Sequence, residues 1–309
     1  MPNYNDSVYI EASIKGIFRQ TRRPDAIIFV DDASTDNSLD IVRSLDPEGT
    51  LLRIITKPTN KGVVDSFNIA LAQTTTDYVN FVSMDDSVDP TWIEKSMAML
   101  EACPNAGICF TDLYHDYGDR KGPYRAFISD GPCFLTPEEF ANKICGHYIS
   151  GTSVVVKTDK LLEVGGYRPE LRWHSDWFAW LAIACRYGTC FVPECLVSLK
   201  VRDTSHSTVG MQDKQAQDEV LRNIMLILNS DEFADIVPQF VIGQVLRHWS
   251  NYSLIESILR HPELMTFKTQ MLVNGILTHR SLEVEMAMQE RGRRSQAELQ
   301  ALTAAQRGH

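Results

Sequence analysis

The sequence of 309 residues lacks long hydrophobic runs, and this absence excludes proteins that cross a membrane through an apolar helix. Such a helix needs about 18 or more consecutive apolar residues, and no run approaches this length. The amino end also lacks the pattern of a secretory signal peptide. We therefore expect a cytoplasmic protein, either free or peripheral to the inner face of the membrane.

Basic residues are also scarce. The chain has 30 Lys and Arg against 40 Asp and Glu, which gives a formal net charge of -10. No dense stripe of Lys or Arg interrupts this acidic character. Nucleic-acid binding depends on neutralising many phosphates, so we expect no nucleic-acid partner. Small anionic ligands can still bind through a metal ion.

Cysteines are few and do not form a disulfide pattern. Seven of them occur at irregular spacing, unlike the paired framework of a small secreted domain, so a reducing compartment fits best. Cys185, Cys190 and Cys195 are five residues apart and match none of the C-x-x-C spacings of zinc sites. We interpret them as buried structural thiols, with a zinc site as the alternative.

What the sequence does contain is an alternation of short apolar runs and helical patterns over its first 190 or so residues, with 44% apolar residues to build a core. Strands are predicted at 27–30, 51–55, 78–82, 106–111 and 151–156. Helices are predicted after Asp6, through Leu45, after Gly62, after Pro90 and at 175–187. This order predicts an α/β fold with a doubly wound, mostly parallel sheet. The polar stretch 112–131 predicts long loops or an exposed hairpin.

Two features concern the organisation of the whole chain. Beyond Gly210 the periodicity is helical, so we expect an α/β domain at 1–209 and a helical appendage at 210–309. The appendage can form a homodimer contact or dock on the membrane, but packing on its own domain is favoured. The start Met1-Pro2-Asn3-Tyr4 leaves no room for a strand before the first helix, so the start is misassigned or the true start lies upstream.

Two acidic pairs, Asp31-Asp32 and Asp85-Asp86, follow the apolar runs at 27–30 and 78–82. In open α/β sheets, ligands bind outside the carboxyl ends of the strands. Carboxylates that converge there can hold a divalent cation and a polar ligand. The pairs therefore predict a metal-assisted nucleotide site.

Several short motifs make the sequence similar to family 2 glycosyltransferases, over about residues 1–207. They occur in the family's order: Pro2-Asn3-Tyr4-Asn5, Val30-Asp31-Asp32-Ala33-Ser34-Thr35-Asp36, Asn60-Lys61-Gly62, Met84-Asp85-Asp86 and Asp176-Trp177. The resemblance implies the GT-A fold and transfer of a sugar from a nucleotide diphosphate donor, UDP- or dTDP-linked, to an acceptor hydroxyl with inversion. It also implies a place in cell-surface polysaccharide or glycoconjugate synthesis.

The resemblance assigns the nucleotide to residues from three of these motifs: Pro2, Tyr4, Asp32, Lys61 and Asp85. Tyr4 can stack on the nucleobase, and Asp32 can accept a hydrogen bond from a base N–H. The alternative for Asp32 is a turn or helix-cap carboxylate. For Lys61 it is a solvated loop lysine.

The resemblance implies that Asp86 binds Mg²⁺ or Mn²⁺ bridging the two phosphates, although Ser83 or Met84 stands where the family has its first acid. A turn before Pro90 is the alternative. His206 lies in a region resembling the one that closes over the diphosphate, where it or Arg202 can touch phosphate or metal. A surface loop histidine is the alternative.

Asp176 falls where the family places its catalytic base, at the start of an aromatic-rich helix. A carboxylate at that position is also a common helix cap, and Ser175 replaces the acidic neighbour that the family usually has. A further departure is Phe67, which stands where many relatives carry an Arg. Catalysis is the favoured interpretation because an inverting displacement needs one base.

The acceptor is expected to be a saccharide, a lipid-linked molecule or a protein, contacted by 112–131 and by carboxyl-terminal elements. Two other functions stay open. One is a catalytically impaired nucleotide-sugar-binding module on the same scaffold, and the other is a Mg²⁺-dependent phosphoryl-transfer α/β domain.

Overall fold

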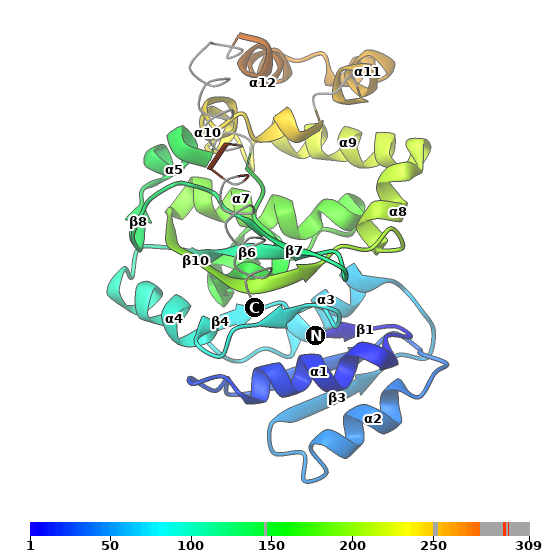
Figure 1. Ribbon diagram of the computed structural model, residues 1–309. Helices are drawn as coiled ribbons and strands as arrows, with labels where there is room; N and C mark the ends of the chain where they lie inside the picture. The colour runs from blue at the N-terminus through cyan, green and yellow to red at the C-terminus, as the bar shows by residue number, and fades with distance from the viewer. Residues whose placement is uncertain (145–146, 250–252, 279–292, 295, 297–309) are drawn as a thin grey trace.

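The computed structural model describes residues 1–144, 147–249, 253–278, 293–294 and 296. Two β-sheets and the helices around them form an α/β fold (Figure 1). The smaller sheet and its helices lie at the bottom of Figure 1, the larger sheet crosses the middle, and the last helices lie at the top. The predicted α/β class is confirmed.

The smaller sheet contains β1 Pro2–Asn3, β2 Ile27–Asp31 and β3 Leu52–Thr56, in this order and all parallel. A strand therefore precedes the first helix, and the prediction that the chain has no room for one is wrong. It was missed because two residues are too short to show a pattern of alternation. Main-chain hydrogen bonds hold it on β2, with Val30 N–H donating to the Met1 carbonyl and Asp32 N–H to that of Asn3.

The larger sheet contains β4 Tyr78–Asn80, β5 Ser87–Val88, β6 Ile108–Asp116, β7 Lys121–Tyr124, β8 Cys133–Leu135, β9 Val154–Lys157 and β10 Thr189–Lys200. Its order is β4-β9-β6-β10-β5, with β7 on β6 and β8 on β10. Only β6 and β10 pair in parallel among the described strands of this sheet. The sheet is thus more antiparallel than predicted. The stretch 112–131 contains the predicted hairpin, formed by β6 and β7.

The larger sheet separates two hydrophobic cores because successive side chains of a strand point to opposite faces. Phe110 of β6 belongs to one core and its neighbour Cys109 to the other. Helices along the first 190 residues cover these faces and the smaller sheet: α1 Ser7–Phe18, α2 Ser38–Leu45, α3 Val63–Ala72, α4 Trp92–Ala102, α5 Pro137–Ile144, α6 Thr158–Glu163 and α7 Ser175–Tyr187. The 3₁₀ turns Gly151–Ser153 and Pro169–His174 precede β9 and α7. Helix α7 is buried along most of its length, which matches its content of Trp, Phe and Leu.

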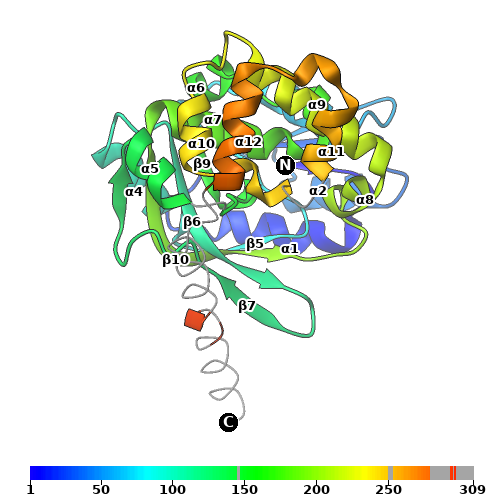
Figure 2. The ribbon, with the colours of Figure 1, turned by 90° about the horizontal axis from the view of Figure 1, so that it is seen from above.

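The carboxyl-terminal helices pack on α5 and α7 (Figures 1 and 2). They are α8 His206–Gln212, α9 Lys214–Asn229, α10 Val237–Ile242, α11 Ser253–Arg260 and α12 Phe267–Thr278, with 3₁₀ turns at Val245–Trp249 and Pro262–Leu264. Apolar residues of α9 such as Val220 and Ile224 share one core with Phe178 of α7. The predicted boundary between residues 209 and 210 falls inside α8. The rest of the predicted appendage, 279–309, lies almost wholly outside the described residues.

Two further expectations concern the thiols and the membrane. Cys185 and Cys190 are buried free thiols and Cys195 is half-buried, while Cys145 lies outside the described residues. Within the described ranges, no helix combines the length and the apolar character needed to cross a bilayer.

Candidate active site

A cavity of about 700 Å³ opens between the smaller sheet, the end of β10 and the start of α7. It brings together residues that are far apart in the sequence. Most of the predicted site residues line it, namely Pro2, Tyr4, Asp32, Asp85, Asp86, Asp176 and His206. Lys61 is not among the lining residues: its side chain is exposed, and its backbone N–H donates to Asp32. Acidic side chains from distant stretches of the sequence therefore line one cavity.

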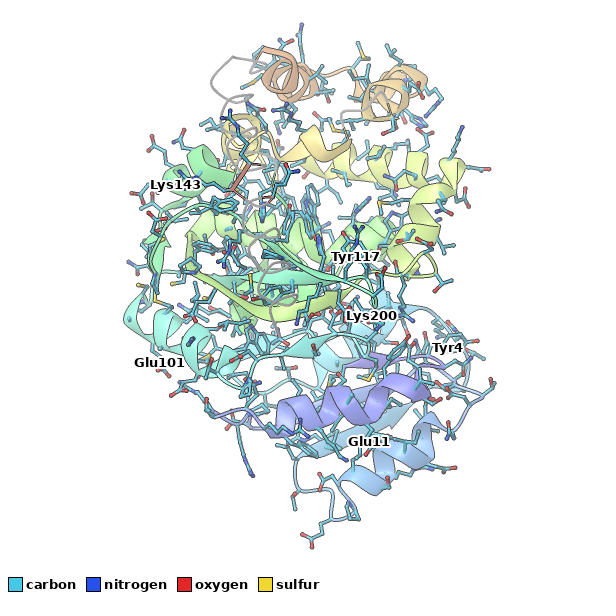
Figure 3. The ribbon with its side chains drawn as sticks, viewed as in Figure 1. Tyr4, Glu11, Glu101, Tyr117, Lys143 and Lys200 are labelled. Atoms are coloured by element: carbon cyan, nitrogen blue, oxygen red, sulfur yellow. The ribbon has the colours of Figure 1, made fainter. Side chains whose placement is uncertain are left out.

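One end of the cavity is formed by the loop after β1. Tyr4 is 47% exposed and lies at the periphery beside β1 (Figure 3). Side chains on either side of it fix the loop, since Asn3 Nδ2 donates to Asp31 Oδ1 and Asn5 Oδ1 accepts from Thr35 N–H. Asn5 has a positive φ of 55°, which asparagine tolerates better than most residues. The tyrosine ring is thus presented at the mouth of the cavity by a firmly held backbone.

Asp32 is buried and strongly held. Its carboxylate accepts backbone N–H bonds from Lys61 (2.9 Å) and Gly62 (2.7 Å). The ammonium of Lys57 lies 2.6 Å from Asp32 Oδ1 and 2.7 Å from Asp65 Oδ2. A carboxylate has about four acceptor positions, so one is left for a ligand. Asp32 therefore orders the 60–62 loop, which is the turn role considered as the alternative. It also lines the cavity, where its remaining acceptor position could bind a base N–H.

Asp85 is paired with a cation from the other end of the domain. Arg202 Nη2 lies 2.6 Å from Asp85 Oδ2, and Arg202 Nη1 lies 3.5 Å from Asp6 Oδ1. Ser83, one of the two residues that can stand where the family has its first acid, donates its hydroxyl to Asp85 Oδ1 at 2.8 Å. The guanidinium thus joins the amino-terminal loop, the acidic pair and the segment after β10 at one wall of the cavity.

Asp86 is more deeply buried than its neighbour, with 4% of its surface exposed. Thr152 donates its hydroxyl to Asp86 Oδ2, and Lys200 N–H donates to Asp86 Oδ1 at 3.0 Å. Burial, reinforced by the charge of Asp85, raises the pKa of Asp86 to about 7. These two adjacent carboxylates share a site with too little positive charge, which a bound cation would relieve.

The residues of this acidic pair fit Mg²⁺ or Mn²⁺, because both cations prefer carboxylate and phosphate oxygens. In the part of the chain that the structure describes, no three His, Cys, Asp or Glu side chains gather as a metal site. A cation would therefore need ligands from its substrate as well as from Asp85 and Asp86. The role of His206 as a further ligand stays a prediction.

His206 lines the cavity at the first turn of α8. Its ring meets Trp173 edge-on, with centroids 6.0 Å apart, and burial lowers its pKa, so the ring is neutral at pH 7. Trp173 in turn donates Nε1–H to Gln217 Oε1 of α9 at 2.9 Å. His174 is buried and contacts Gln217. The carboxyl-terminal helices thus help to build this side of the cavity.

Asp176 stands in the first turn of α7 and lines the cavity. Its Oδ1 accepts from the N–H of Trp177 at 2.8 Å, and its Oδ2 lies against Gly151, where a Cβ would be only 2.7 Å away. Burial raises the pKa of Asp176 to about 6. No cation is recorded within salt-bridge distance of this carboxylate in the described residues. A carboxylate with such a pKa is suited to act as a general base near neutral pH.

Two of the departures from the family pattern, Phe67 and Ser175, line the same cavity. Phe67 packs edge-on against Phe81, with ring centroids 3.7 Å apart, and stacks obliquely on Tyr167. It lines the cavity and also belongs to the core, as the sequence suggested. Ser175 is buried, and its hydroxyl has no hydrogen-bond partner in the described structure.

Some residues of the site could not be found from the sequence pattern. Lys57 was missed because a lysine next to a strand end is usually solvated, and its burial becomes evident only when Asp32 and Asp65 meet around it. Thr152 and Gly151 were read only as part of a strand. The one signal available was Gly151 itself, since a glycine in a strand often marks a place where the backbone closely approaches another group.

Comparison with known proteins supports one family. The model of glycosyl transferase family 2 matches residues 1–159. An uncharacterized glycosyltransferase of Haemophilus influenzae is 35% identical over 137 residues, which are 44% of this chain and 39% of that protein. The "Putative teichuronic acid biosynthesis glycosyltransferase TuaG" of Bacillus subtilis is 24% identical over 67% of this chain and 79% of its own length. The chain thus spans less than half the length of the Haemophilus relative.

Solved structures show the same architecture. TarS 1-349 of S. aureus, in complex with UDP-GlcNAc, aligns with a TM-score of 0.65 and 18% identity over 89% of this chain and 77% of that one. The mannosyltransferase PcManGT from Pyrobaculum calidifontis, in complex with GDP-Man and Mn²⁺, aligns with a TM-score of 0.57 and 17% identity over 98% of this chain and 84% of that one. The chain belongs to glycosyl transferase family 2 and has the GT-A fold.

Proposed function

We propose that this enzyme transfers a sugar from a nucleotide diphosphate sugar to an acceptor hydroxyl in one displacement, with inversion at the anomeric carbon. The observation that carries the proposal is the order of groups along a single cavity. Tyr4, Asp32 and Asp176 all line it; Arg202 joins Asp6 of the Tyr4 loop to Asp85, and Asp86 bonds to Thr152, the neighbour of the Gly151 against which Asp176 lies. This order matches a nucleobase, a diphosphate and an acceptor hydroxyl.

The donor end suits a planar base. Tyr4 offers a ring for stacking, and Asp32 has one acceptor position for a base N–H. We propose a UDP- or dTDP-linked donor, and the complex of TarS with UDP-GlcNAc supports uridine. Pro2 and Lys61 are proposed to flank the nucleotide, Lys61 chiefly through the backbone bond that orders its loop.

The middle of the cavity suits a diphosphate. Arg202 can donate two parallel N–H bonds to phosphate oxygens, a geometry that lysine lacks. When bound, Mg²⁺ or Mn²⁺ would be held by Asp86 with Asp85 and would neutralise negative charge on the diphosphate. The Mn²⁺ complex of PcManGT supports a metal at this position.

Asp176 is proposed as the base of the displacement. Its carboxylate takes the proton of the acceptor hydroxyl, and the hydroxyl oxygen forms the new bond to the anomeric carbon. The bond between that carbon and the diphosphate oxygen breaks, and the nucleotide diphosphate leaves with the electron pair. Because the pKa of Asp176 is about 6, the carboxylate is mostly ionised at pH 7 and ready to accept the proton.

Replacing Asp176 by asparagine separates a base from a helix cap. Asparagine caps helices about as well as aspartate, so a capping role predicts nearly normal turnover. A base predicts a loss of about 10²- to 10⁴-fold in kcat with nucleotide affinity retained. Asp40→Asn, an exposed carboxylate in the first turn of α2, is the matched control. Nearly normal turnover of Asp176→Asn would remove the residue from the scheme.

A thermal-shift screen of UDP-, dTDP- and GDP-sugars with Mn²⁺ tests the donor, since a ligand of the folded state raises the melting temperature. The product's anomeric configuration, read by NMR, tests inversion. Binding without hydrolysis or transfer would favour the impaired binding module.

We also propose a role in cell-surface polysaccharide or glycoconjugate synthesis, which the name of TuaG supports. Peripheral membrane attachment and dimerisation through the carboxyl-terminal helices stay predictions. The phosphoryl-transfer alternative is not pursued, because the chain belongs to a glycosyltransferase family.

A further inference from the structure

Arg202 joins two acidic groups at the wall of the cavity, and one of them belongs to the proposed metal site. Its Nη2 lies 2.6 Å from Asp85 Oδ2, and its Nη1 lies 3.5 Å from Asp6 Oδ1. The side chain of Asp85 is only 8% exposed, so solvent screens this ion pair less than it screens a surface pair. Arg202 is therefore the counter-ion of Asp85 in this structure.

The other three carboxylate oxygens of the pair Asp85-Asp86 accept hydrogen bonds from uncharged donors. The hydroxyl of Ser83 donates to Asp85 Oδ1 at 2.8 Å. The N–H of Lys200 donates to Asp86 Oδ1 at 3.0 Å, and the hydroxyl of Thr152 donates to Asp86 Oδ2. Thr152 is 2% exposed and the N–H of Lys200 is part of β10, so these two donors are fixed by the fold. In the described structure, Asp85 Oδ2 is thus the oxygen of the pair whose partner is a charged and flexible side chain.

Arg202 is placed where its head group can change partners. It lies in the segment 201–205, which leads from the end of β10 to α8. Its side chain is 27% exposed, and its Nε is buried without a hydrogen-bond partner in the described structure. Asp85 and Asp6 thus leave one donor of the guanidinium unused. An incoming phosphate can accept from this donor and from Nη2 together, because arginine binds oxyanions through two parallel N–H groups.

Charge decides which partners Arg202 and a divalent cation can share. Both are positive, so a cation at Asp85 Oδ2 is repelled by the guanidinium that contacts the same oxygen. A diphosphate is negative and attracts both of them. Transfer of the guanidinium from Asp85 to a phosphate oxygen therefore removes the repulsion and leaves the carboxylate free to bind the metal.

We propose that Arg202 is an exchangeable counter-ion of Asp85 that couples metal binding to nucleotide binding. While no diphosphate is bound, the guanidinium competes with the cation for Asp85 and keeps the metal affinity low. When a diphosphate binds, the guanidinium moves to its oxygens and Asp85 is released to Mg²⁺ or Mn²⁺. By thermodynamic linkage, the metal must raise the nucleotide affinity by the same factor. The inference rests on the proposed function and adds to it the regulation of the metal site.

Binding of Mn²⁺ without nucleotide is the first test. Electron paramagnetic resonance measures the free ion during titration of the full chain. Arg202→Met removes the charge and keeps an unbranched side chain. It should bind Mn²⁺ at least about 5-fold more tightly than the wild type, which is the lower end of typical coupling between two sites. If this variant does not fold, Arg202→Gln replaces it with the same expected result.

Lys200→Met is the matched control for the loss of a nearby positive charge. The ammonium of Lys200, which is labelled in Figure 3, and the guanidinium of Arg202 lie 5.7 and 5.1 Å from the centre of the Tyr9 ring. Among the described residues, however, Asp85 pairs with Arg202 and not with Lys200. We expect Lys200→Met to change the Mn²⁺ affinity by less than about 2-fold, because salt screens charges that are not in contact. Unchanged or weaker Mn²⁺ binding by Arg202→Met, or an equal gain in Lys200→Met, would overturn the inference.

Saturating UDP supplies the second test. UDP tightens Mn²⁺ binding in both proteins, because its phosphate oxygens are themselves metal ligands. Only the wild type also gains from the release of Asp85. The ratio of Mn²⁺ affinities with and without UDP should therefore be at least about 5-fold larger in the wild type than in Arg202→Met. Equal ratios in the two proteins would contradict the coupling.

Calorimetry with UDP and UDP-sugars on the same samples separates this inference from the proposed function. A wild-type chain that binds neither of them with Mn²⁺ would contradict the proposed function and this inference with it. A chain that binds them, but whose Mn²⁺ affinity does not depend on Arg202, would contradict only the exchange of counter-ions.

Discussion

Replacing Gly151 by alanine is expected to displace the carboxylate of Asp176 while leaving the nucleotide end of the cavity intact. A Cβ at position 151 would lie 2.7 Å from Asp176 Oδ2 and 2.9 Å from Cδ1 of Phe81. Neither neighbour can simply turn away, because the carboxylate is held by the N–H of Trp177 and the phenylalanine ring is packed on Phe67. The added methyl group must therefore move the proposed base.

The size of the effect follows from these distances. Ordinary contacts of carbon with carbon or oxygen are about 3.3 to 3.5 Å, so the carboxylate and the ring must each move by roughly 0.6 Å. A misplacement of about 1 Å in a reacting group can cost about 100-fold in rate. We therefore expect kcat to fall roughly 10- to 100-fold. Overpacking should also lower the free energy of unfolding by about 1 to 3 kcal/mol.

The assay compares kcat, the KM for the donor and nucleotide affinity in wild type and Gly151→Ala. Affinity for the nucleotide should stay unchanged, because the atoms nearest the added Cβ belong to Asp176 and Phe81 and not to Tyr4 or Asp32. Gly16→Ala is the control, since a Cβ there meets only Val88 at an ordinary 3.8 Å.

A double variant makes the test specific. In the background of Asp176→Asn, the alanine at 151 should cause little further loss of kcat, because its effect passes through the group already removed. A normal kcat in Gly151→Ala would refute the placement of the base. A full additional loss in the double variant would show that the methyl group acts elsewhere.

Three other predictions concern charge. Lys57→Met should lower the free energy of unfolding by about 3 to 5 kcal/mol, because Asp32 is left buried without its cation. Thermal unfolding measures this loss against the exposed control Lys15→Met. Equal stability of the two variants would contradict the prediction. Binding of Mn²⁺ with UDP at pH 7 should release about half a proton, because the pKa of Asp86 is about 7 and the cation binds only the ionised carboxylate. The measurement is calorimetry in buffers of different ionisation enthalpy. Binding heats that do not vary with the buffer would exclude the proton release. For Asp176, the pKa is raised from 3.8 to about 6 in the folded state, so the folded chain binds more protons and its stability falls as pH rises through this window. Asp176→Asn should therefore gain stability over wild type between pH 4 and 6, and a loss would reverse the assigned sign.

The sequence predicted the fold where composition and periodicity reflect burial. The apolar run of β2 and the pattern of α7 were placed almost to the residue, because continuous burial needs continuous apolar content. Strand direction was not predictable in this way. That β9 lies antiparallel between β4 and β6 depends on long connections whose paths leave no mark on the strands themselves.

For the site, the sequence indicated the acidic residues but not their partners. Asp32 and Asp85 were found because acids at strand ends are unusual enough to be noticed. Their cations, Lys57 and Arg202, lie 25 and 117 positions further along the chain, and only folding brings them within 2.6 Å. Of the two, only Arg202 was considered for the site, and its pairing with Asp85 was not anticipated.

The core shared by α7 and α9 has a consequence for recombination between relatives. The helix that presents Asp176 shares its core with Val220 and Ile224, and the rings of Trp177 and Phe178 meet that of Phe240. A chimera whose junction falls between α7 and α9 would place another relative's apolar residues beneath the helix that carries this chain's carboxylate. Functional exchange therefore requires that both surfaces of that contact be transplanted together.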